Sequence, residues 1–291
     1  MLIHHQTPPV TPKRVVLLGA SGFLAKALMD RLAKAAVPVR AIGREEIDLT
    51  ADGAGTRLAG ALTPGDTLVF LSAVTPDKGR GIEHFLANVR MGEAVCAAIA
   101  AVMPAHIVYA SSDAVYPFSA APTTEASCAE PTDLYGAAHL ARELMLKGAA
   151  KCPVAILRPT MIFGAGDTHN SYGANRFRRM ARKAGKITLF GGGEETRDHM
   201  FIDDVVTLFE RVIGHRSAGT LNLVSGRSVS FGDLARMVAG RFSSPVEIEM
   251  LPRQSAITHR QFDASGLREA FPDFRLTPLE DAIAAAHAAG D

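Results

Sequence analysis

Short apolar runs alternate with amphipathic stretches along the first 160 residues of the chain. The segment 23–36 repeats leucine every four residues, which is typical of a helix with one buried face. Further helices are predicted through 88–101 and from about residue 135, and an alanine-rich helix is predicted at 282–289. Strand-helix alternation of this kind predicts a parallel sheet covered on both faces. The runs of strand length are 14–18, 37–42, 67–72, 107–110 and 154–157.

Composition narrows the class of protein. The 31 basic and 30 acidic residues give a net charge of +1 without a long run of one sign, which disfavours a nucleic-acid surface. The three cysteines form no CxxC spacing, and residues 1–12 lack the apolar core of a signal peptide. No run approaches the roughly 18 apolar residues of a membrane span. We therefore expect a cytoplasmic protein with no nucleic-acid partner and no membrane partner. The histidines lack ligand spacing, so no metal is expected.

A glycine-containing turn joins the first predicted strand to the first predicted helix. It runs Gly19-Ala20-Ser21-Gly22-Phe23-Leu24-Ala25. Glycine lets backbone N–H groups approach a pyrophosphate, whose charge then lies at the helix N-terminus. Because the turn falls inside a βαβ stretch, the sequence predicts a dinucleotide-binding site there.

The end of the second predicted strand bears on which dinucleotide binds. An NAD site usually has an acidic residue here, whereas this chain has Gly43 and Arg44. A guanidinium suits a 2′-phosphate, so we expect NADP, with NAD as a possible cofactor. The alternative is that Arg44 is a solvated loop residue beside Glu45 and Glu46. Asp48 either bonds the adenine edge or caps a turn.

Ser112 and Tyr135 form the strongest chemical signal. Ser112 ends an apolar strand, and Tyr135 opens a helix 23 residues later. The serine can polarise a carbonyl oxygen, and the tyrosine can deliver or remove its proton. Free tyrosine has a pKa of about 10, and a nearby cation lowers that pKa by favouring the phenolate. The pair predicts hydride transfer between an alcohol and a ketone. The alternative, a strand-end hydroxyl and a helix-start aromatic without chemistry, explains the motif context less well.

These residues and their order resemble the extended short-chain dehydrogenase/reductases, a family of nucleotide-sugar epimerases, dehydratases and reductases. The resemblance covers nearly the whole chain. It implies an α/β fold, with a Rossmann-type doubly wound parallel sheet in residues 1–165 and 198–224 and a smaller α+β substrate-binding lobe in 166–197 and 225–291. The matching segments are Gly19-x-x-Gly22-x-x-Ala25, Leu71-Ser72-Ala73, Asn88-Val89, Ser111 to Tyr116, Tyr135-Gly136, Leu157-Arg158-Pro159, Ile162-Phe163-Gly164, Arg197-Asp198, Phe201 to Val205 and Leu221-Asn222-Leu223.

The resemblance also implies roles. Ser112 is expected to donate to the oxyanion and Tyr135 to act as general acid and base. Arg197 and Arg253 are expected to hold the diphosphate of a nucleoside-diphosphate sugar, with surface ion pairing as the alternative for both. By analogy the chain is expected to form a homodimer. The expected cofactor contacts are Gly19, Ser21, Gly22, Phe23, Leu24, Arg44, Asp48, Leu49, Ser72, Ala73, Asn88, Tyr135 and His139.

Three departures from the family pattern shape the functional prediction. His139 replaces a lysine and carries little charge at neutral pH, which weakens alcohol oxidation more than ketone reduction. Asp113-Ala114 replaces the Asp-Glu pair of the family's dehydratases, so elimination of water is disfavoured. Asp113 itself either protonates a sugar oxygen or accepts hydrogen bonds at the strand end. Met161 stands where many relatives have a substrate-contacting asparagine.

The leading prediction is an NADP-dependent reductase of a nucleotide-linked keto sugar, with Tyr135 as the acid and Ser112 as the oxyanion donor. The first alternative is an NAD-dependent nucleotide-sugar 4-epimerase. The second alternative is a non-catalytic NADP-binding sensor or scaffold. His139 and Met161 would suit a sensor, but a sensor has no need of Ser112 and Tyr135.

The substitution His139→Lys tests the missing cation. Lysine would place a permanent charge one helical turn from Tyr135, so activity is expected to rise, most of all above about pH 7, where histidine is neutral. The measurement is the rate of hydride transfer from about pH 6 to about pH 9. Rates that match the parent protein across that range would show that residue 139 does not tune Tyr135.

Overall fold

The computed structural model describes residues 2–170, 172–253 and 255–290, and the chain divides into two compact units. Unit 1 comprises Met1–Pro117, Ser127–Pro159 and Val206–Asn222. Unit 2 comprises Phe118–Ala126, Thr160–Val205 and Leu223–Asp291. The chain therefore passes between the units several times.

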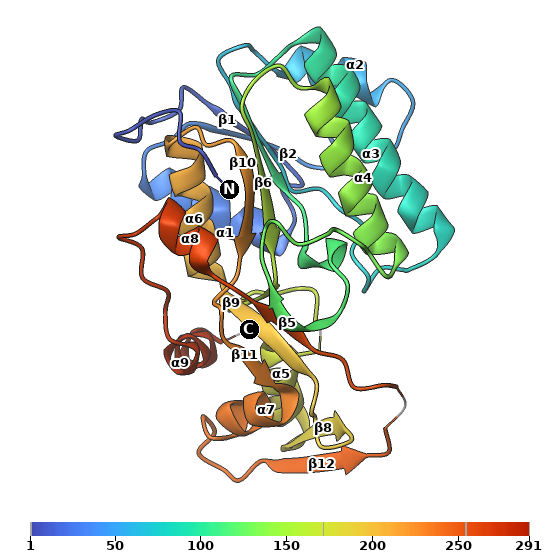
Figure 1. Cartoon of the computed structure of the whole chain (residues 1–291), viewed down its shortest axis with the longest axis vertical. Helices are drawn as coiled ribbons and strands as arrows, with labels where there is room; N and C mark the ends of the chain where they lie inside the picture. Colours follow the sequence, from blue (N-terminus) through green and yellow to red (C-terminus); the bar gives the residue numbers. More distant parts are fainter. Residues whose placement is uncertain (1, 171, 254, 291) are drawn as a thin grey trace. The chain divides into compact units, whose positions relative to one another are not determined.

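Unit 1 is built on a six-stranded sheet in the order β10-β6-β4-β3-β1-β2, with parallel pairing at β1–β2, β1–β3, β3–β4 and β4–β6. Helices α1 and α6 lie on one side of this sheet and α2, α3 and α4 on the other (Figure 1). This confirms the predicted doubly wound fold. The elements are β1 (Val15–Leu18), α1 (Phe23–Lys34), β2 (Val39–Ile42), α2 (Ala54–Ala61), β3 (Thr67–Phe70), α3 (Ile82–Ala101), β4 (His106–Ala110), α4 (Leu134–Ala149), β6 (Val154–Pro159), α6 (Ile202–Gly214) and β10 (Gly219–Leu223).

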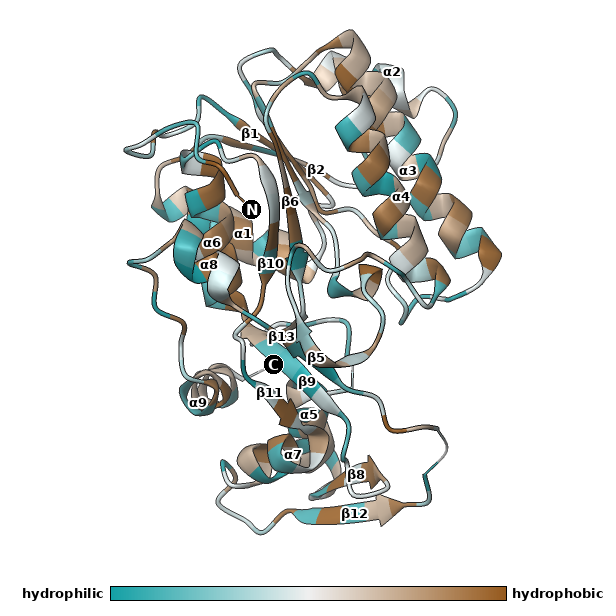
Figure 2. Cartoon of the chain, viewed as in Figure 1, coloured by the Kyte–Doolittle hydropathy of each residue, from teal (hydrophilic) through white to brown (hydrophobic). Residues whose placement is uncertain are grey.

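The core of unit 1 follows from the apolar pattern. Every residue of β1 and β3 is buried, as expected for inner strands of a sheet covered on both faces. Leu28 and Leu32, predicted to share one helical face, are fully buried on α1. Figure 2 shows the same distribution in the six-stranded sheet, where β1 and β6 are coloured as hydrophobic. None of the helices in the described ranges is long and apolar enough to cross a membrane.

Two helices differ from the sequence prediction. Helix α3 begins at Ile82, six residues before the predicted start. The sequence pattern missed its first turns because the apolar residues there, Ile82 and Leu86, are exposed and do not lie on one buried face. Helix α2 was not predicted, since its eight residues include two glycines. Packing explains its presence: a Cβ on Gly55 would lie 2.7 Å from the Ala97 Cβ of α3, so only glycine permits that approach.

Unit 2 combines small sheets with short helices. A three-stranded sheet has the order β11-β9-β7, and two further pairs join β8 to β12 and β5 to β13. Apolar residues of α5, α7 and α9 form its core, among them Phe177, Leu234 and Ile283. The elements are β5 (Ser119–Thr123), β7 (Met161–Phe163), α5 (Ala174–Ala184), β8 (Lys186–Phe190), β9 (Thr196–Phe201), β11 (Ser228–Ser230), α7 (Phe231–Ala239), β12 (Glu247–Leu251), β13 (Arg260–Phe262), α8 (Ser265–Ala270) and α9 (Leu279–Ala289).

The residues of unit 1 differ from those predicted for the cofactor-binding domain, 1–165 and 198–224. Segment 118–126 belongs to unit 2 because β5 pairs in parallel with β13. Strand β7 also belongs to unit 2, where it pairs with β9. A single residue separates β7 from β6. The two strands therefore follow one another without a loop, and the sequence carries no loop signal at the boundary.

Candidate active site

The strand order of unit 1 brings the predicted site residues to one edge of the sheet. After β1 the chain adds β2 on one side and β3 on the other, so the order reverses between β1 and β3. Open parallel sheets bind ligands outside the carboxyl ends of the strands at such a reversal. Gly19 follows β1, Ser72 follows β3 and Ser112 follows β4, all at this edge.

The turn after β1 is shaped for close backbone approach. Gly19 has a φ of +94°, and a Cβ there would lie 3.0 Å from the backbone nitrogen of Ser72. Gly22 caps α1 without a side-chain hydrogen bond, and the first turn of α1 contains no acidic residue. The positive end of this helix is thus left open to an anion. The residues present fit the pyrophosphate of a dinucleotide.

The other predicted contacts around this turn differ in exposure. Ser21 is exposed, whereas Phe23 and Leu49 are buried. Asn88, also buried, holds the loop after β3: its Oδ1 accepts from Val74 N at 2.9 Å, and its Nδ2 donates to Val74 O at 3.0 Å. Asn88 therefore fixes the loop that carries Ser72 and Ala73.

Arg44 and Asp48 lie beyond the end of β2. The Arg44 side chain is 83% exposed, and its Nε donates to Asp48 Oδ2 at 3.0 Å. Asp48 Oδ1 accepts from both the backbone nitrogen and the Oγ1 of Thr50, and these bonds lower the pKa of Asp48. Asp48 thus caps a turn, one of its two predicted roles. An exposed pair of this kind contributes about 0–1 kcal/mol, so it constrains the Arg44 side chain only weakly.

Ser112 and Tyr135 lie together. Asp133 caps α4 by accepting from Gly136 N at 2.8 Å, which puts Tyr135 in the first turn of the helix. Ser112 accepts from Ala114 N at 3.1 Å, and its hydroxyl lowers the pKa of Tyr135, which shows that the two side chains are close. Burial raises the pKa of Tyr135 to about 12, and the charge of Asp113 adds to the rise. The hydroxyl of Tyr135 is therefore protonated at neutral pH.

A glycine contact sets the position of Tyr135 against Ser112. A Cβ on Gly136 would lie 2.1 Å from the carbonyl oxygen of Ala114, in the 3₁₀ turn η1 (Asp113–Val115). It would also lie 3.0 Å from the Cβ of Pro131. Only glycine allows the start of α4, which carries Tyr135, to lie directly on η1, which follows Ser112.

His139 is a buried, neutral residue. Its Nδ1 shares a hydrogen bond of 2.7 Å with the Tyr109 hydroxyl, and its ring meets that of Tyr135 edge-on at 4.5 Å. Burial and, to a lesser degree, the charge of Arg142 place the pKa of His139 well below its ordinary value. The predicted pH window for His139→Lys is corrected accordingly: because the pKa of the histidine is lowered well below its ordinary value, the advantage of lysine is not confined to pH values above 7.

The second ring nitrogen of His139, Nε2, is buried without a partner among the described residues and suits a ribose hydroxyl.

The prediction missed an ion pair behind the site. Arg158 donates to both carboxylate oxygens of Glu143, at 2.8 and 2.6 Å, and both residues are buried. Ser111 donates to the same carboxylate at 2.6 Å, and Arg158 also donates to the Tyr116 hydroxyl at 2.6 Å. This network ties α4 to β6 and to the segment before Ser112. The spacing of eight residues between Tyr135 and Glu143, on one helical face, was the signal available in the sequence.

Arg142 is a second missed residue. It is fully buried on α4, and it donates to Ser72 O at 2.6 Å and to Asn88 Oδ1 at 3.3 Å. Its guanidinium lies 4.1 Å from the ring centre of Phe70. Arg142 thus connects the helix of Tyr135 to the loop after β3.

The two arginines predicted to hold a diphosphate belong to unit 2. Arg197 on β9 donates to the carbonyl oxygen and the Oγ1 of Thr258, at 2.8 and 2.7 Å. Arg253 forms ion pairs with Glu194 and Glu195. For Arg253 the ion-pairing alternative is therefore realised in this structure.

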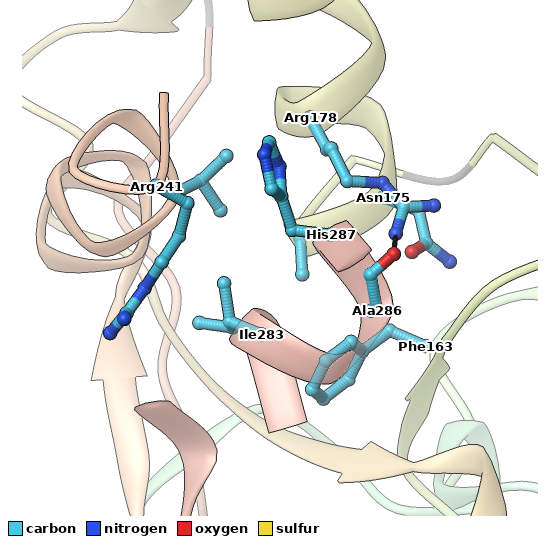
Figure 3. Close-up of a pocket in the computed structure, with 9 residues that line it drawn as sticks. Phe163, Asn175, Arg178, Arg241, Ile283, Ala286 and His287 are labelled. Atoms are coloured by element: carbon cyan, nitrogen blue, oxygen red, sulfur yellow. Dashed lines mark hydrogen bonds between the residues drawn. The ribbon is translucent and has the colours of Figure 1, made fainter. Parts of the chain in front are cut away.

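Unit 2 also contains a small pocket between α5, α7 and α9 (Figure 3). Arg178 donates to the carbonyl oxygen of Ala286 at its edge, and Ile283 and His287 line it. None of the predicted site residues is part of its lining. In the described ranges no three His, Cys, Asp or Glu residues are grouped to hold a metal ion.

Comparisons with known proteins agree with this architecture. Residues 15–224 match the NAD dependent epimerase/dehydratase family. A UDP-glucose 4-epimerase from Mycolicibacterium smegmatis is 27% identical over 88% of this chain and 91% of its own length. A dTDP-L-rhamnose 4-epimerase from Burkholderia thailandensis is 32% identical, but the match spans only 46% of this chain and 40% of that protein.

Solved structures share the fold. MoeE5 in complex with UDP-glucose and NAD has a TM-score of 0.80 at 21% identity, covering 94% of this chain and 97% of that one. RMD from Pseudomonas aeruginosa, complexed with NADPH, has a TM-score of 0.81 at 21% identity, covering 95% and 98%.

The chain belongs to the NAD dependent epimerase/dehydratase family, within the extended short-chain dehydrogenase/reductases. It is an NAD(P)-dependent enzyme of that class, as the sequence predicted.

The variant Gly136→Ala tests the contact between α4 and η1. The added methyl must push the helix away from Ala114, and a displacement of about 1 Å can lower a catalytic rate about 100-fold. We expect a loss of this order in kcat with little change in cofactor affinity, measured by steady-state kinetics and fluorescence titration. Gly148→Ala on the same helix is the matched control, because its Cβ would meet nothing within 4 Å. Equal rates for the two variants would contradict the assigned role of Gly136.

Proposed function

We propose that the chain reduces a keto group on a nucleoside-diphosphate sugar, with NADP as cofactor. The observation that carries this proposal is that Ser112, after β4, and Tyr135, in the first turn of α4, come close enough for Ser112 to lower the pKa of Tyr135. This pair lies in the same unit and at the same sheet edge as the glycine turn that fits a pyrophosphate.

In this reaction Ser112 Oγ donates a hydrogen bond to the carbonyl oxygen and stabilises the charge that develops there. Tyr135 Oη gives its proton to that oxygen and is left as a phenolate, which water reprotonates. The reduced nicotinamide, when bound, supplies the hydride to the carbonyl carbon. Gly19, Ser72 and His139 Nε2 would hold the cofactor.

The protonation state of Tyr135 supports the reductive direction. With a pKa raised to about 12, the residue is a phenol at neutral pH and is ready to donate. Oxidation of an alcohol would require the phenolate, which burial and Asp113 disfavour. Asp113 followed by Ala114 offers no second carboxylate for elimination of water.

We further propose that Arg197 and Arg253 bind the diphosphate of the substrate. A planar guanidinium suits paired phosphate oxygens. Arg253 would exchange its ion pairs with Glu194 and Glu195 for the phosphate, whereas Arg197 is held in place by Thr258. The names of the matched relatives, which are nucleotide-sugar epimerases, support a sugar nucleotide as the substrate.

A 4-epimerase with tightly held NAD is the second candidate. The observation in its favour is the match to a UDP-glucose 4-epimerase along 91% of that protein. An epimerase oxidises and re-reduces the sugar within one turnover, so it consumes no cofactor. A reductase consumes one NADPH for each product molecule. Membership of a catalytic family removes the sensor alternative.

A cytoplasmic homodimer is the expected setting of this function. The described cysteines Cys96, Cys128 and Cys152 are free, as in a reducing compartment. Leu86 on α3 and Leu144 on α4 expose 43% and 61% of their surface, which supports pairing through these helices.

Substitution of the catalytic pair tests the reaction. Tyr135→Phe removes the proton donor and is expected to lower kcat about 100- to 10,000-fold. Ser112→Ala is expected to lower it about 100- to 1,000-fold. NADPH oxidation is measured alongside product formation with a panel of nucleoside-diphosphate keto sugars. The control is Tyr172→Phe, which removes a hydroxyl that donates to Thr188 O in unit 2. Turnover that survives loss of the Tyr135 hydroxyl would refute the mechanism, and product without net NADPH oxidation would favour the epimerase.

The cofactor proposal rests on Arg44. Arg44→Ala removes a charge-assisted contact worth about 1.5–3 kcal/mol, so NADPH affinity is expected to fall about 10- to 150-fold. NADH affinity should stay unchanged because NADH lacks the 2′-phosphate. The measurement is fluorescence titration with both cofactors, and Arg40→Ala, which removes an arginine paired with Glu46, is the control. Equal losses for both cofactors, or no loss at all, would count against NADP selection by Arg44.

A further inference from the structure

We propose that Arg142 is a positioning residue that supplies the positive charge missing at residue 139. It acts on Tyr135 through the stacked rings of Tyr109 and His139. Its consequence for catalysis rests on the proposed hydride transfer, whereas its effect on the ionisation of Tyr135 does not.

The site needs a cation because Tyr135 must become a phenolate during turnover. In reduction the phenolate forms when the proton leaves, and in oxidation it must exist beforehand. Burial, Asp113 and Asp133 all oppose that state. His139 is neutral and cannot offset them. A cation close enough to act through the buried interior would stabilise the phenolate in both directions.

Arg142 lies on the same face of α4 as Tyr135 and His139, seven residues after Tyr135 and three after His139. Helical side chains lean toward the N-terminus, which directs the guanidinium back toward Tyr135. It lies 5.1 Å from the ring centre of Tyr109. The Tyr109 hydroxyl meets His139 Nδ1 at 2.7 Å, and the His139 ring meets Tyr135 at 4.5 Å. A continuous chain of contacts therefore joins the charge to the phenol.

No carboxylate of the described residues neutralises the charge of Arg142. Its guanidinium donates to the carbonyl oxygen of Ser72 and the amide oxygen of Asn88, both neutral, and the described residues form no ion pair with it. The adjacent Glu143 is paired with Arg158 instead. Fully buried arginines are rare unless paired, and strongly perturbed buried charges cluster at functional sites. The low polarity of the interior also extends the reach of such a charge.

The surrounding fold is shaped to accept Arg142. A Cβ on Gly92 of α3 would lie 2.9 Å from the Cγ of Arg142, so glycine leaves room for its stem. The rings of Phe70 and Tyr109 flank its head. These contacts hold the guanidinium in a fixed position, which it needs in order to act on the ionisation of Tyr135.

The charged and titratable groups facing Tyr135 come from several elements. Asp113 of η1 and Asp133 at the start of α4 raise the pKa of Tyr135, whereas Arg142 lowers it. Tyr109 of β4 has its own pKa raised by burial, so it stays neutral. Glu143 and Arg158 neutralise one another. Arg142 is therefore the one cation among these groups that opposes the two carboxylates.

This assignment changes the expectation for lysine at residue 139. A lysine there would place a second buried cation beside Arg142, and Arg142 already disfavours a charge on His139. The single variant His139→Lys should gain little. Combined with Arg142→Met, the same lysine should restore the charge that the methionine removes.

The test is to follow the ionisation of Tyr135 directly, without substrate. The chain has four tyrosines, so uniform replacement by 3,5-difluorotyrosine, whose phenol is more acidic, gives few ¹⁹F resonances to resolve. Tyr135→Phe identifies the signal of interest. The midpoint of its titration is measured from about pH 6 to about pH 12 in the full-length protein and in each variant.

Arg142→Gln keeps a donor for Ser72 O but removes the charge, so the midpoint of Tyr135 should rise by about 1 pH unit or more. Arg142→Lys should keep the midpoint near that of the parent, and His139→Lys with Arg142→Met should return it toward the parent. Arg31→Met, which removes an arginine paired with Glu210 on the other side of the sheet, should leave it unchanged. If Arg142→Gln does not fold, Arg142→Met serves for the same comparison, and the lysine swap serves as the rescue.

A folded, neutral variant of Arg142 with an unchanged Tyr135 midpoint would overturn the proposal, as would a rise of the same size in Arg142→Lys. Turnover is measured separately with NADPH and sugar nucleotides. If the Tyr135 midpoint shifts in the Arg142 variants but the parent protein turns over none of the sugar nucleotides, the proposed function is refuted and the role of Arg142 stands. If the parent turns over a sugar nucleotide but the midpoint does not shift, the role of Arg142 is refuted and the proposed function stands.

Discussion

The ion pair between Glu143 and Arg158 is the interaction on which the site depends. It joins α4 to β6 inside the protein, where removal of one partner typically costs about 3–5 kcal/mol because the other charge is left buried. Such a pair is tolerated only when further hydrogen bonds satisfy it, and Ser111 and Tyr116 provide them. The same bonds fix the end of β4, so the network that compensates the buried charges also positions Ser112 beside Tyr135.

Close backbone packing completes the arrangement. Gly19 against Ser72 and Gly136 against Ala114 are contacts that any side chain would break. Each brings together segments that are distant in the sequence but adjacent at the carboxyl edge of the sheet. The first shapes the anion-binding turn and the second places the phenol. Rigid elements packed this tightly can hold reacting groups in one geometry without a large change on binding.

Charge placement gives this chain its individual character within the family. The residue one turn after Tyr135 is a neutral histidine, and the next charge on that face of α4 is a buried arginine without a carboxylate partner among the described residues. Moving the cation along the helix keeps a positive field near the phenol, and it frees His139 Nε2 to bond a neutral ligand atom. The chemistry then depends less on protonation of residue 139 and more on the fixed charge behind it.

The sequence by itself determined the alternating strands and helices, the glycine turn and the Ser112–Tyr135 pair, because periodicity and short motifs are local properties of the chain. It did not determine the unit boundary after β6, the early start of α3, or helix α2, where local signals are weak or misleading. Only the tertiary structure decided that Asp48 caps a turn, that Arg253 is ion-paired, and that Arg142 has no carboxylate partner among the described residues. Whether a charge is compensated, and how far a pKa moves, depends on neighbours from other elements. That information is not contained in any one stretch of sequence.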